Sequence, residues 1–215
     1  MGSQKYHHFM IVLTMTATEI LSELDDDLKE MLRVCDGKDR AFRRLVLKTS
    51  RFPLYVNPIY HTTRRRNRWA LFLMARSRRD AGESLAVFVC LVDTPCGLHA
   101  LMPTFTDGIR EVNIYTSHFF RRYRERFAPH LASGAAAIEY YFRENYNYAY
   151  TFREPGEGIT EVFGSGHDGV AMGLRSVAGG INLFKTFVTY PMLKGRQIDV
   201  FGAADEHRRE LHEAE

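Results

Sequence analysis

The chain has few cysteines and no long hydrophobic run. Only three of its 215 residues are cysteines, and Cys35, Cys90 and Cys96 are widely spaced, without a CxxC pair. Such a set argues against a disulfide framework or a structural zinc site and favours reduced, buried thiols. No apolar stretch approaches the roughly 20 residues that a membrane helix needs, and the run at 8–15 is too short for a secretory signal. These absences predict a cytoplasmic protein that does not enter a membrane.

The chain also lacks the extreme composition of a disordered or fibrous protein. Apolar residues make up 45% and charged residues 26%, which are ordinary globular values and allow a sizeable core. We predict a single α+β domain over residues 1–215. It would consist of a helical N-terminal subregion at 1–56 and a sheet-containing core at 57–205.

The charged residues are unevenly distributed, although the formal net charge is only +3. Seven arginines and no acidic residue lie between Arg64 and Arg79, and residues 121–126 add four arginines against one glutamate. A basic centre between acidic ends suits a polyanion such as RNA or DNA, whereas ordinary solvated arginines are the simpler alternative. The predicted nucleic-acid-binding residues are Arg64, Arg65, Arg66, Arg121 and Lys185.

Four helices are indicated by capping residues and by apolar residues at helical spacing. Thr16 and Glu19 form a capping-box pattern that starts a helix, which we expect to end near Gly37. A second, shorter helix is expected at 39–48. A third is expected at 118–127, and Ser133 caps a fourth that runs through Glu144.

Strand signals begin at Arg68, after an irregular connection around Pro53 and Pro58 and an arginine-rich loop. The expected strands cover 69–75, 85–92, 98–104, 111–115, 148–153, 161–163, 169–174 and 181–190. Turns are expected at 80–82, 95–97, 107–108, 168–169 and 179–180. Short turns between most strands predict a mainly antiparallel sheet with helices packed on it.

The helix at 118–127 has the most function-like pattern in the chain. On a helical wheel Phe119, Phe120, Tyr123 and Phe127 share one side, and the opposite side holds His118, Arg121, Arg122, Glu125 and Arg126. The aromatic side would anchor the helix to the sheet. The polar side is either an ordinary solvated face or a binding surface for anions.

A phosphodiester on that polar face would meet groups suited to its cleavage. His118 is of the residue type that transfers protons near neutral pH, and Arg122 and Arg126 would stabilise charge on the phosphate oxygens. RNA supplies its own nucleophile, the 2′-hydroxyl, so positioning, proton transfer and charge stabilisation would suffice without a metal ion.

Two other segments carry weaker signals. The loop 164–169 contains His167 and Asp168 and reads as a hairpin turn rather than a phosphate-cradling loop or a metal site, since no HxxxH or HExxH pattern is present. We therefore expect no metal and no other cofactor. Lys185 and Thr186 lie in an otherwise apolar strand, where they either face a cleft or mark an exposed sheet edge.

The order of these parts resembles the barnase/RelE-type ribonuclease toxin superfamily over about residues 111–200. The resemblance is carried by the His118, Arg122 and Arg126 helix, a second helix, and a β-meander ending in the strand at 185–189. It implies metal-independent RNA cleavage. His118 would be the general acid or base, Arg122 and Arg126 would steady the phosphate, and Thr186 would orient it. This superfamily domain is usually about half as long, so the strands at 68–115 would be an extension or an unrelated module.

Two functions are compatible with the sequence. The first is a toxin or defence endoribonuclease, catalysed by His118, Arg122, Arg126 and Thr186, with RNA as substrate and a neutralising protein as partner. The second is a non-catalytic nucleic-acid-binding or protein-interaction module that uses the arginine-rich surface.

Overall fold

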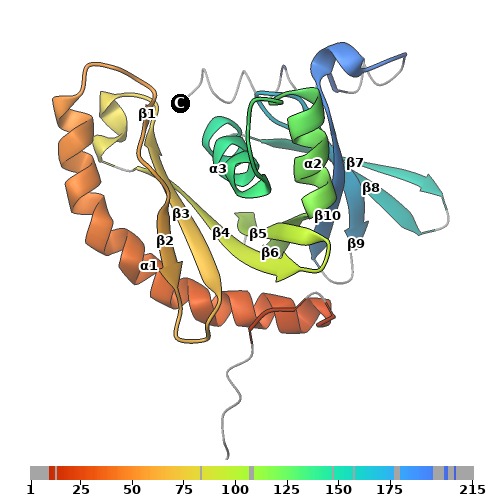
Figure 1. Ribbon diagram of the computed structural model, residues 1–215, viewed down its shortest axis with the longest axis horizontal. Helices are drawn as coiled ribbons and strands as arrows, with labels where there is room; N and C mark the ends of the chain where they lie inside the picture. Colours follow the sequence, from red (N-terminus) through yellow and green to blue (C-terminus); the bar gives the residue numbers. More distant parts are fainter. Residues whose placement is uncertain are drawn as a thin grey trace, which may run out of the picture. The chain divides into compact units, whose positions relative to one another are not determined.

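The chain belongs to the α+β class, as predicted (Figure 1). The described residues of the computed structural model hold three α-helices and ten strands, paired mainly antiparallel. The chain divides into two compact units, Met1–Val92 and Asp93–Glu215. The structure describes residues 10–12, 14–82, 84–106, 109–146, 148–156, 158–176, 180–195, 201–202 and 206.

The N-terminal unit begins with one long helix, α1, Ala17–Lys48. The capping box is confirmed, because the Thr16 side chain accepts from the Glu19 backbone and the Glu19 side chain accepts from the Thr16 backbone. The predicted helix end at Gly37 is wrong. A helical glycine costs only about 1 kcal/mol relative to alanine, and Phe42 and Val46 beyond it are buried. Packing therefore carries the helix through Gly37.

Four strands complete this unit: β1 Leu54–Tyr55, β2 Ile59–Thr62, β3 Arg68–Ala75 and β4 Leu85–Thr94. β3 pairs antiparallel with the other three, and a 3-10 turn, η1 Arg78–Ala81, replaces part of the simple hairpin expected at 80–82. β1 and β2 were not predicted, because Pro53 and Pro58 suggested an irregular connection. Both strands are short and lie on the same side of β3, where proline is tolerated.

The C-terminal unit contains a six-strand sheet in the order β5-β6-β10-β9-β8-β7. β10 pairs parallel with β6, and the other pairs are antiparallel. β10 is therefore an interior strand, which excludes edge exposure as the reason for Lys185 and Thr186. The strands are β5 Gly97–Thr106, β6 Ile109–Tyr115, β7 Ala149–Gly156, β8 Ile159–Ser165, β9 Val170–Ser176 and β10 Ile181–Val188.

Two helices, α2 Ser117–Arg126 and α3 Gly134–Glu144, pack on this sheet through aromatic side chains (Figure 1). The Tyr115 ring of β6 stacks on Phe184 of β10, with ring centroids 4.9 Å apart. Phe119 of α2 and Tyr141 of α3 contact the Tyr115 ring as well. All four side chains are fully buried. This aromatic core fixes the position of α2 on β10.

A few predictions concern residues that the structure does not describe: the turn at 107–108, Gly179 of the turn at 179–180, and the charged tail from His207. Among the described residues no helix is both long enough and apolar enough to cross a membrane. The three cysteines are free, but the prediction that they are buried holds only for Cys90, because Cys35 is half-buried and Cys96 is exposed.

Candidate functional site

Helix α2 presents the predicted His and Arg residues because its opposite side is buried. Thr116 caps the helix by accepting a hydrogen bond from the backbone of Phe119 at 3.2 Å. Phe119, Phe120 and Tyr123 are buried, as predicted for the aromatic side of the helix, whereas Phe127 is exposed. The first turn holds His118 and no acidic residue. An imidazole therefore lies where free backbone N–H groups favour anions.

A pocket of about 630 Å3 lies at this end of α2. It is lined by the first turns of α2 and α3, by the start of β5, and by two arginines. No carboxylate occurs among its described lining residues, which are Cys96, Gly97, Leu98, Ser117, His118, Phe120, Arg121, Arg124, Gly134 and Ala135. Two helix N-termini and two guanidinium groups give the pocket a positive potential.

The hydrogen bond to His118 determines which of its ring nitrogens carries the proton. The Arg121 guanidinium contacts His118 Nδ1, and a guanidinium group only donates hydrogen bonds. Nδ1 is therefore the acceptor, and the proton of the neutral ring lies on Nε2. Burial, followed by the positive charges of Arg121 and Arg122, lowers the pKa of His118. At neutral pH this histidine offers an N–H donor and no free base nitrogen.

The two arginines of the pocket have different roles. Arg124 donates from Nε to the carbonyl of Leu131 at 2.9 Å and from a terminal nitrogen to Ala132 at 3.4 Å, so it holds the loop between α2 and α3. Arg121 is exposed, and its guanidinium contacts the His118 ring. Arg121 thus retains donors for an anion.

Arg122 does not join His118 in the pocket. Its guanidinium donates to Glu125 at 2.7 Å, one helical turn away, and this pairing lowers the pKa of the Glu125 carboxyl. Exposed ion pairs of this kind stabilise a protein by no more than about 1 kcal/mol. A phosphate group can therefore compete with Glu125 for Arg122.

Arg126 and Thr186 do come together, as the sequence suggested. Arg126 donates to Thr186 Oγ1 at 3.4 Å and to the backbone carbonyl of Phe187, so it ties the end of α2 to β10. The neighbouring Lys185 is exposed at a bulge, where the pairing of β10 with β9 shifts by one residue. No hydrogen bond among the described residues joins His118 to Arg122, Arg126 or Thr186. Of the four predicted catalytic residues, Arg126 and Thr186 contact each other, whereas His118 contacts Arg121 and Arg122 contacts Glu125.

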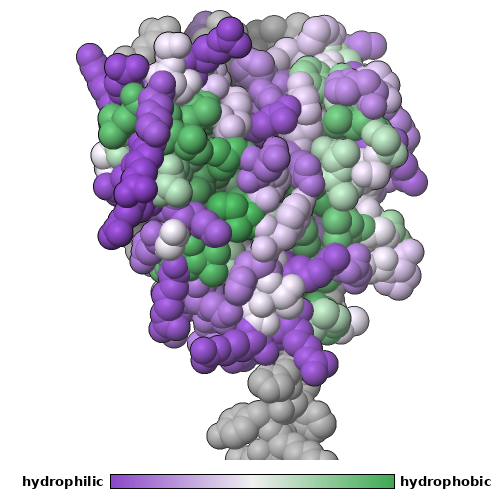
Figure 2. All heavy atoms as spheres, turned by 60° about the vertical axis from the view of Figure 1, so that its left-hand side comes forward, coloured by the Kyte–Doolittle hydropathy of each residue, from purple (hydrophilic) through white to green (hydrophobic). Residues whose placement is uncertain are grey.

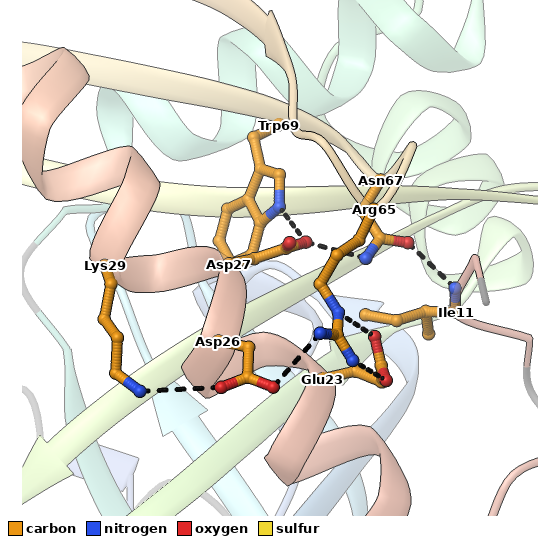
Figure 3. A network of polar contacts seen from close by, with 8 residues as sticks. All are labelled: Ile11, Glu23, Asp26, Asp27, Lys29, Arg65, Asn67 and Trp69. Carbon is orange, nitrogen blue, oxygen red and sulfur yellow. Dashed lines mark hydrogen bonds and ion pairs between the residues drawn. The ribbon is translucent and has the colours of Figure 1, made fainter. Parts of the chain in front are cut away.

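The arginines of the 64–66 turn differ in how far their side chains are engaged, and Figure 3 shows Arg65 against Glu23 and Asp26 of α1. Arg65 donates to both oxygens of Glu23 and contacts Asp26 at 3.2 Å, and its pKa is raised chiefly by the Glu23 hydrogen bond. This pairing attaches the β2–β3 turn to α1. The side chains of Arg64 and Arg66 are exposed. Arg65 thus binds α1 through its side chain, whereas Arg64 contacts Glu30 of α1 through its backbone N–H at 3.2 Å.

The surface around α1 mixes hydrophilic and hydrophobic side chains. In Figure 2, which brings the left-hand side of Figure 1 forward, green hydrophobic areas lie between purple hydrophilic ones. Leu32, Leu45 and Leu47 of α1 are each about half exposed. This surface contrasts with the pocket beside His118, whose charged lining residues are all cationic.

Comparison of the chain with family models, with curated proteins and with solved structures gave no match. The resemblance to ribonuclease toxins stays a prediction. Within the described part of the chain, no group of three or more His, Cys, Asp or Glu side chains is placed to hold a metal ion.

Sequence reasoning found His118 and Arg121 but missed the rest of the pocket. Cys96 and Gly97 come from a turn that was recognised, and Gly134 follows the cap residue Ser133. The sequence therefore indicated both the turn and the start of α3. It did not indicate that they line one pocket with His118, because that depends on the packing of α3 against α2, which short-range patterns do not specify.

Proposed function

We propose that the chain binds a polyanion, with RNA as the expected ligand, and that the pocket beside His118 holds one phosphate group. The supporting observation is that His118, with its proton on Nε2, and the exposed Arg121 line one pocket without a described carboxylate. Both groups donate hydrogen bonds, and a phosphate offers only acceptors at neutral pH. The first turns of α2 and α3 add the partial positive charge of helix N-termini.

Cleavage of the bound RNA is a second candidate function, favoured by the Nε2–H tautomer of His118. An Nε2–H group is suited to donate a hydrogen bond to a phosphate oxygen as negative charge develops there. It is not suited to remove a proton from the 2′-hydroxyl unless the contact with Arg121 breaks. His118 would thus act as a charge-stabilising group in such a reaction.

Binding is tested with a fluorescent single-stranded RNA by anisotropy, at low and moderate salt concentration. Charge-assisted hydrogen bonds contribute about 1.5–3 kcal/mol, so Arg121→Ala should weaken binding about tenfold or more. His118→Ala should weaken it less. Arg44→Ala is the matched control, because Arg44 is an exposed arginine of α1.

The same proteins are then incubated with RNA, with and without a chelator, and the products are separated on a gel. Loss of cleavage in His118→Ala with retained binding supports the enzyme. Binding without cleavage supports the non-catalytic module. Equal RNA affinity of wild type, Arg121→Ala and Arg44→Ala would refute the pocket as the phosphate site. A stronger loss in Arg66→Ala would move the site to the 64–66 turn.

A further inference from the structure

The turn between β8 and β9 contains His167, whose Nδ1 contacts a carboxyl group, whereas Nδ1 of His118 contacts a guanidinium group. His167 exposes 70% of its side chain, whereas the side chain of its neighbour Asp168 is 2% exposed. His167 Nδ1 lies 2.9 Å from Asp168 Oδ1. A solvent-facing imidazole is thus in contact with a buried carboxyl group.

Side chains from two helices donate hydrogen bonds to the Asp168 carboxyl group. Tyr123 of α2 donates its hydroxyl proton to Asp168 Oδ2 at 2.5 Å, and Asn145 at the end of α3 donates from Nδ2 to the same oxygen at 2.7 Å. Burial, and after it the hydrogen bond to Asp168, raises the pKa of Tyr123, so its hydroxyl stays protonated. Asp168 Oδ2 therefore accepts hydrogen bonds from both side chains.

The orientation of the Asn145 amide is fixed independently. Its Oδ1 accepts from the Asp168 backbone N–H at 3.0 Å, and its Nδ2 also donates to the Tyr141 carbonyl at 3.1 Å. The close approach of the turn requires Gly166, because a Cβ atom there would lie 2.5 Å from Asn145 Oδ1. Tyr190 donates to the Gly166 carbonyl at 2.6 Å and fixes the turn from a third segment.

These contacts determine the proton position in neutral His167. An ionised carboxylate only accepts hydrogen bonds, so the contacting Nδ1 carries the proton. Nε2 is then unprotonated in the neutral ring. A buried carboxylate that orients an imidazole in this tautomer makes the outer nitrogen a positioned base.

We propose that the β8–β9 turn is a base site, in which Nε2 of His167 accepts a hydrogen bond, and in a reaction the proton, from the hydroxyl group of a ligand or of water. Asp168, Tyr123 and Asn145 are positioning residues, because they act through the imidazole. The site goes beyond the proposed RNA binding and does not depend on it. Its ligand is defined by chemistry: a hydroxyl group presented at an open surface.

Hydrolysis of p-nitrophenyl acetate probes this base. Nε2 takes a proton from water, and the water oxygen bonds to the carbonyl carbon. The bond to p-nitrophenolate breaks, and the imidazolium then returns its proton to solvent. General-base catalysis contributes about a hundredfold or more in a shaped active site, so a smaller effect of about tenfold is expected at this open turn. His167→Ala should lose it, whereas His130→Ala, which removes another exposed histidine, should not.

The positioning residues are tested by the tautomer rather than by stability. Long-range nitrogen–proton NMR of neutral wild type should show His167 protonated on Nδ1. Asp168→Asn should shift the ring toward the Nε2–H form, whereas Tyr123→Phe, which keeps the carboxylate, should leave Nδ1 protonated. Unchanged ester hydrolysis in His167→Ala, or an Nε2–H tautomer in wild type, would overturn the proposal. RNA binding by the same variants reports on the phosphate pocket separately.

Discussion

His118 and His167 both belong to the C-terminal unit, and each has its Nδ1 atom engaged by a charged neighbour. At His118 the neighbour is the Arg121 guanidinium, which forces Nδ1 to accept and places the proton on Nε2. At His167 the neighbour is the Asp168 carboxylate, which forces Nδ1 to donate and leaves Nε2 bare. One histidine presents a donor to its surroundings, and the other presents an acceptor.

This difference shows that a residue type does not define a chemical role. A donor next to arginines suits a phosphate oxygen, and an acceptor on a buried carboxylate suits a hydroxyl group. The helix pattern singled out His118 as a general acid or base. Its contact with Arg121 narrows that role to donation. The predictions below test this contrast, beginning with the largest expected effect.

Asp168→Ala should destabilise the protein most. The change leaves the donors of Tyr123 and Asn145 buried without their acceptor, and removing one partner of a buried charged network costs about 3–5 kcal/mol. Urea unfolding followed by circular dichroism measures the loss. His167→Ala is the matched control, since loss of an exposed side chain should change the free energy of unfolding by less than about 0.5 kcal/mol. Equal losses would mean that the carboxylate does not anchor the turn.

Gly97→Ala should destabilise the pocket moderately. Gly97 has a φ of +114°, and a Cβ atom there would lie 3.1 Å from Ser117 Cβ at the start of α2. An L-residue forced into the left-handed region costs about 1–2 kcal/mol. Thermal unfolding and RNA anisotropy measure stability and binding together. Gly202→Ala is the control, because nothing lies within 4 Å of a Cβ atom there. If Gly97→Ala is destabilised but binds RNA with unchanged affinity, the turn at Gly97 is not part of the RNA-binding site.

RNA affinity should depend on pH through His118. The pKa of His118 is lowered in the folded chain. The contribution of its neutral ring to the free energy of unfolding is therefore fully present above pH about 6.5, the ordinary pKa of histidine, and is lost as pH falls through the lowered pKa. A bound phosphate favours the charged ring and should raise that pKa. Binding therefore tightens as the solution becomes more acidic, and His118→Gln should flatten this dependence. An identical pH profile in wild type and His118→Gln would contradict it.

Thiol labelling gives the smallest expected effect. Cys96 lines the pocket and is exposed, whereas Cys90 is fully buried and its pKa is raised by that burial. A disulfide reagent such as Ellman's reagent should label Cys96 first and reach Cys90 only on unfolding. Saturating RNA should slow the labelling of Cys96 several-fold. Labelling at the same rate with and without RNA would mean that the ligand lies elsewhere.

Local signals in the sequence predicted much of the fold. Thr16 and Ser133 marked the starts of α1 and α3, because capping depends on residues within one helical turn. The β7 to β10 meander followed from alternation and turns. Gly37 misled the prediction, since its helical cost is small beside the burial of Phe42 and Val46. The insertion of β10 between β6 and β9 depends on long-range pairing and left no local signal.

In the candidate sites, too, local patterns were predictable from the sequence and long-range contacts were not. The polar face of α2 was evident from helical periodicity, and Arg126 does meet Thr186 as the late strand suggested. The His167 and Asp168 pair was read as a turn, because adjacent residues give no indication of burial. Its chemistry depends on Tyr123, 45 residues earlier, and Asn145, 23 residues earlier. Tertiary structure supplies those partners.

A single long-range nitrogen–proton NMR spectrum of the wild-type protein tests most directly whether His118 and His167 have opposite tautomers. It is recorded at a pH where both rings are neutral, with assignments from His118→Gln and His167→Gln. The structure predicts a protonated Nε2 in His118 and a protonated Nδ1 in His167. The same tautomer at both residues, or the reverse assignment, would contradict it.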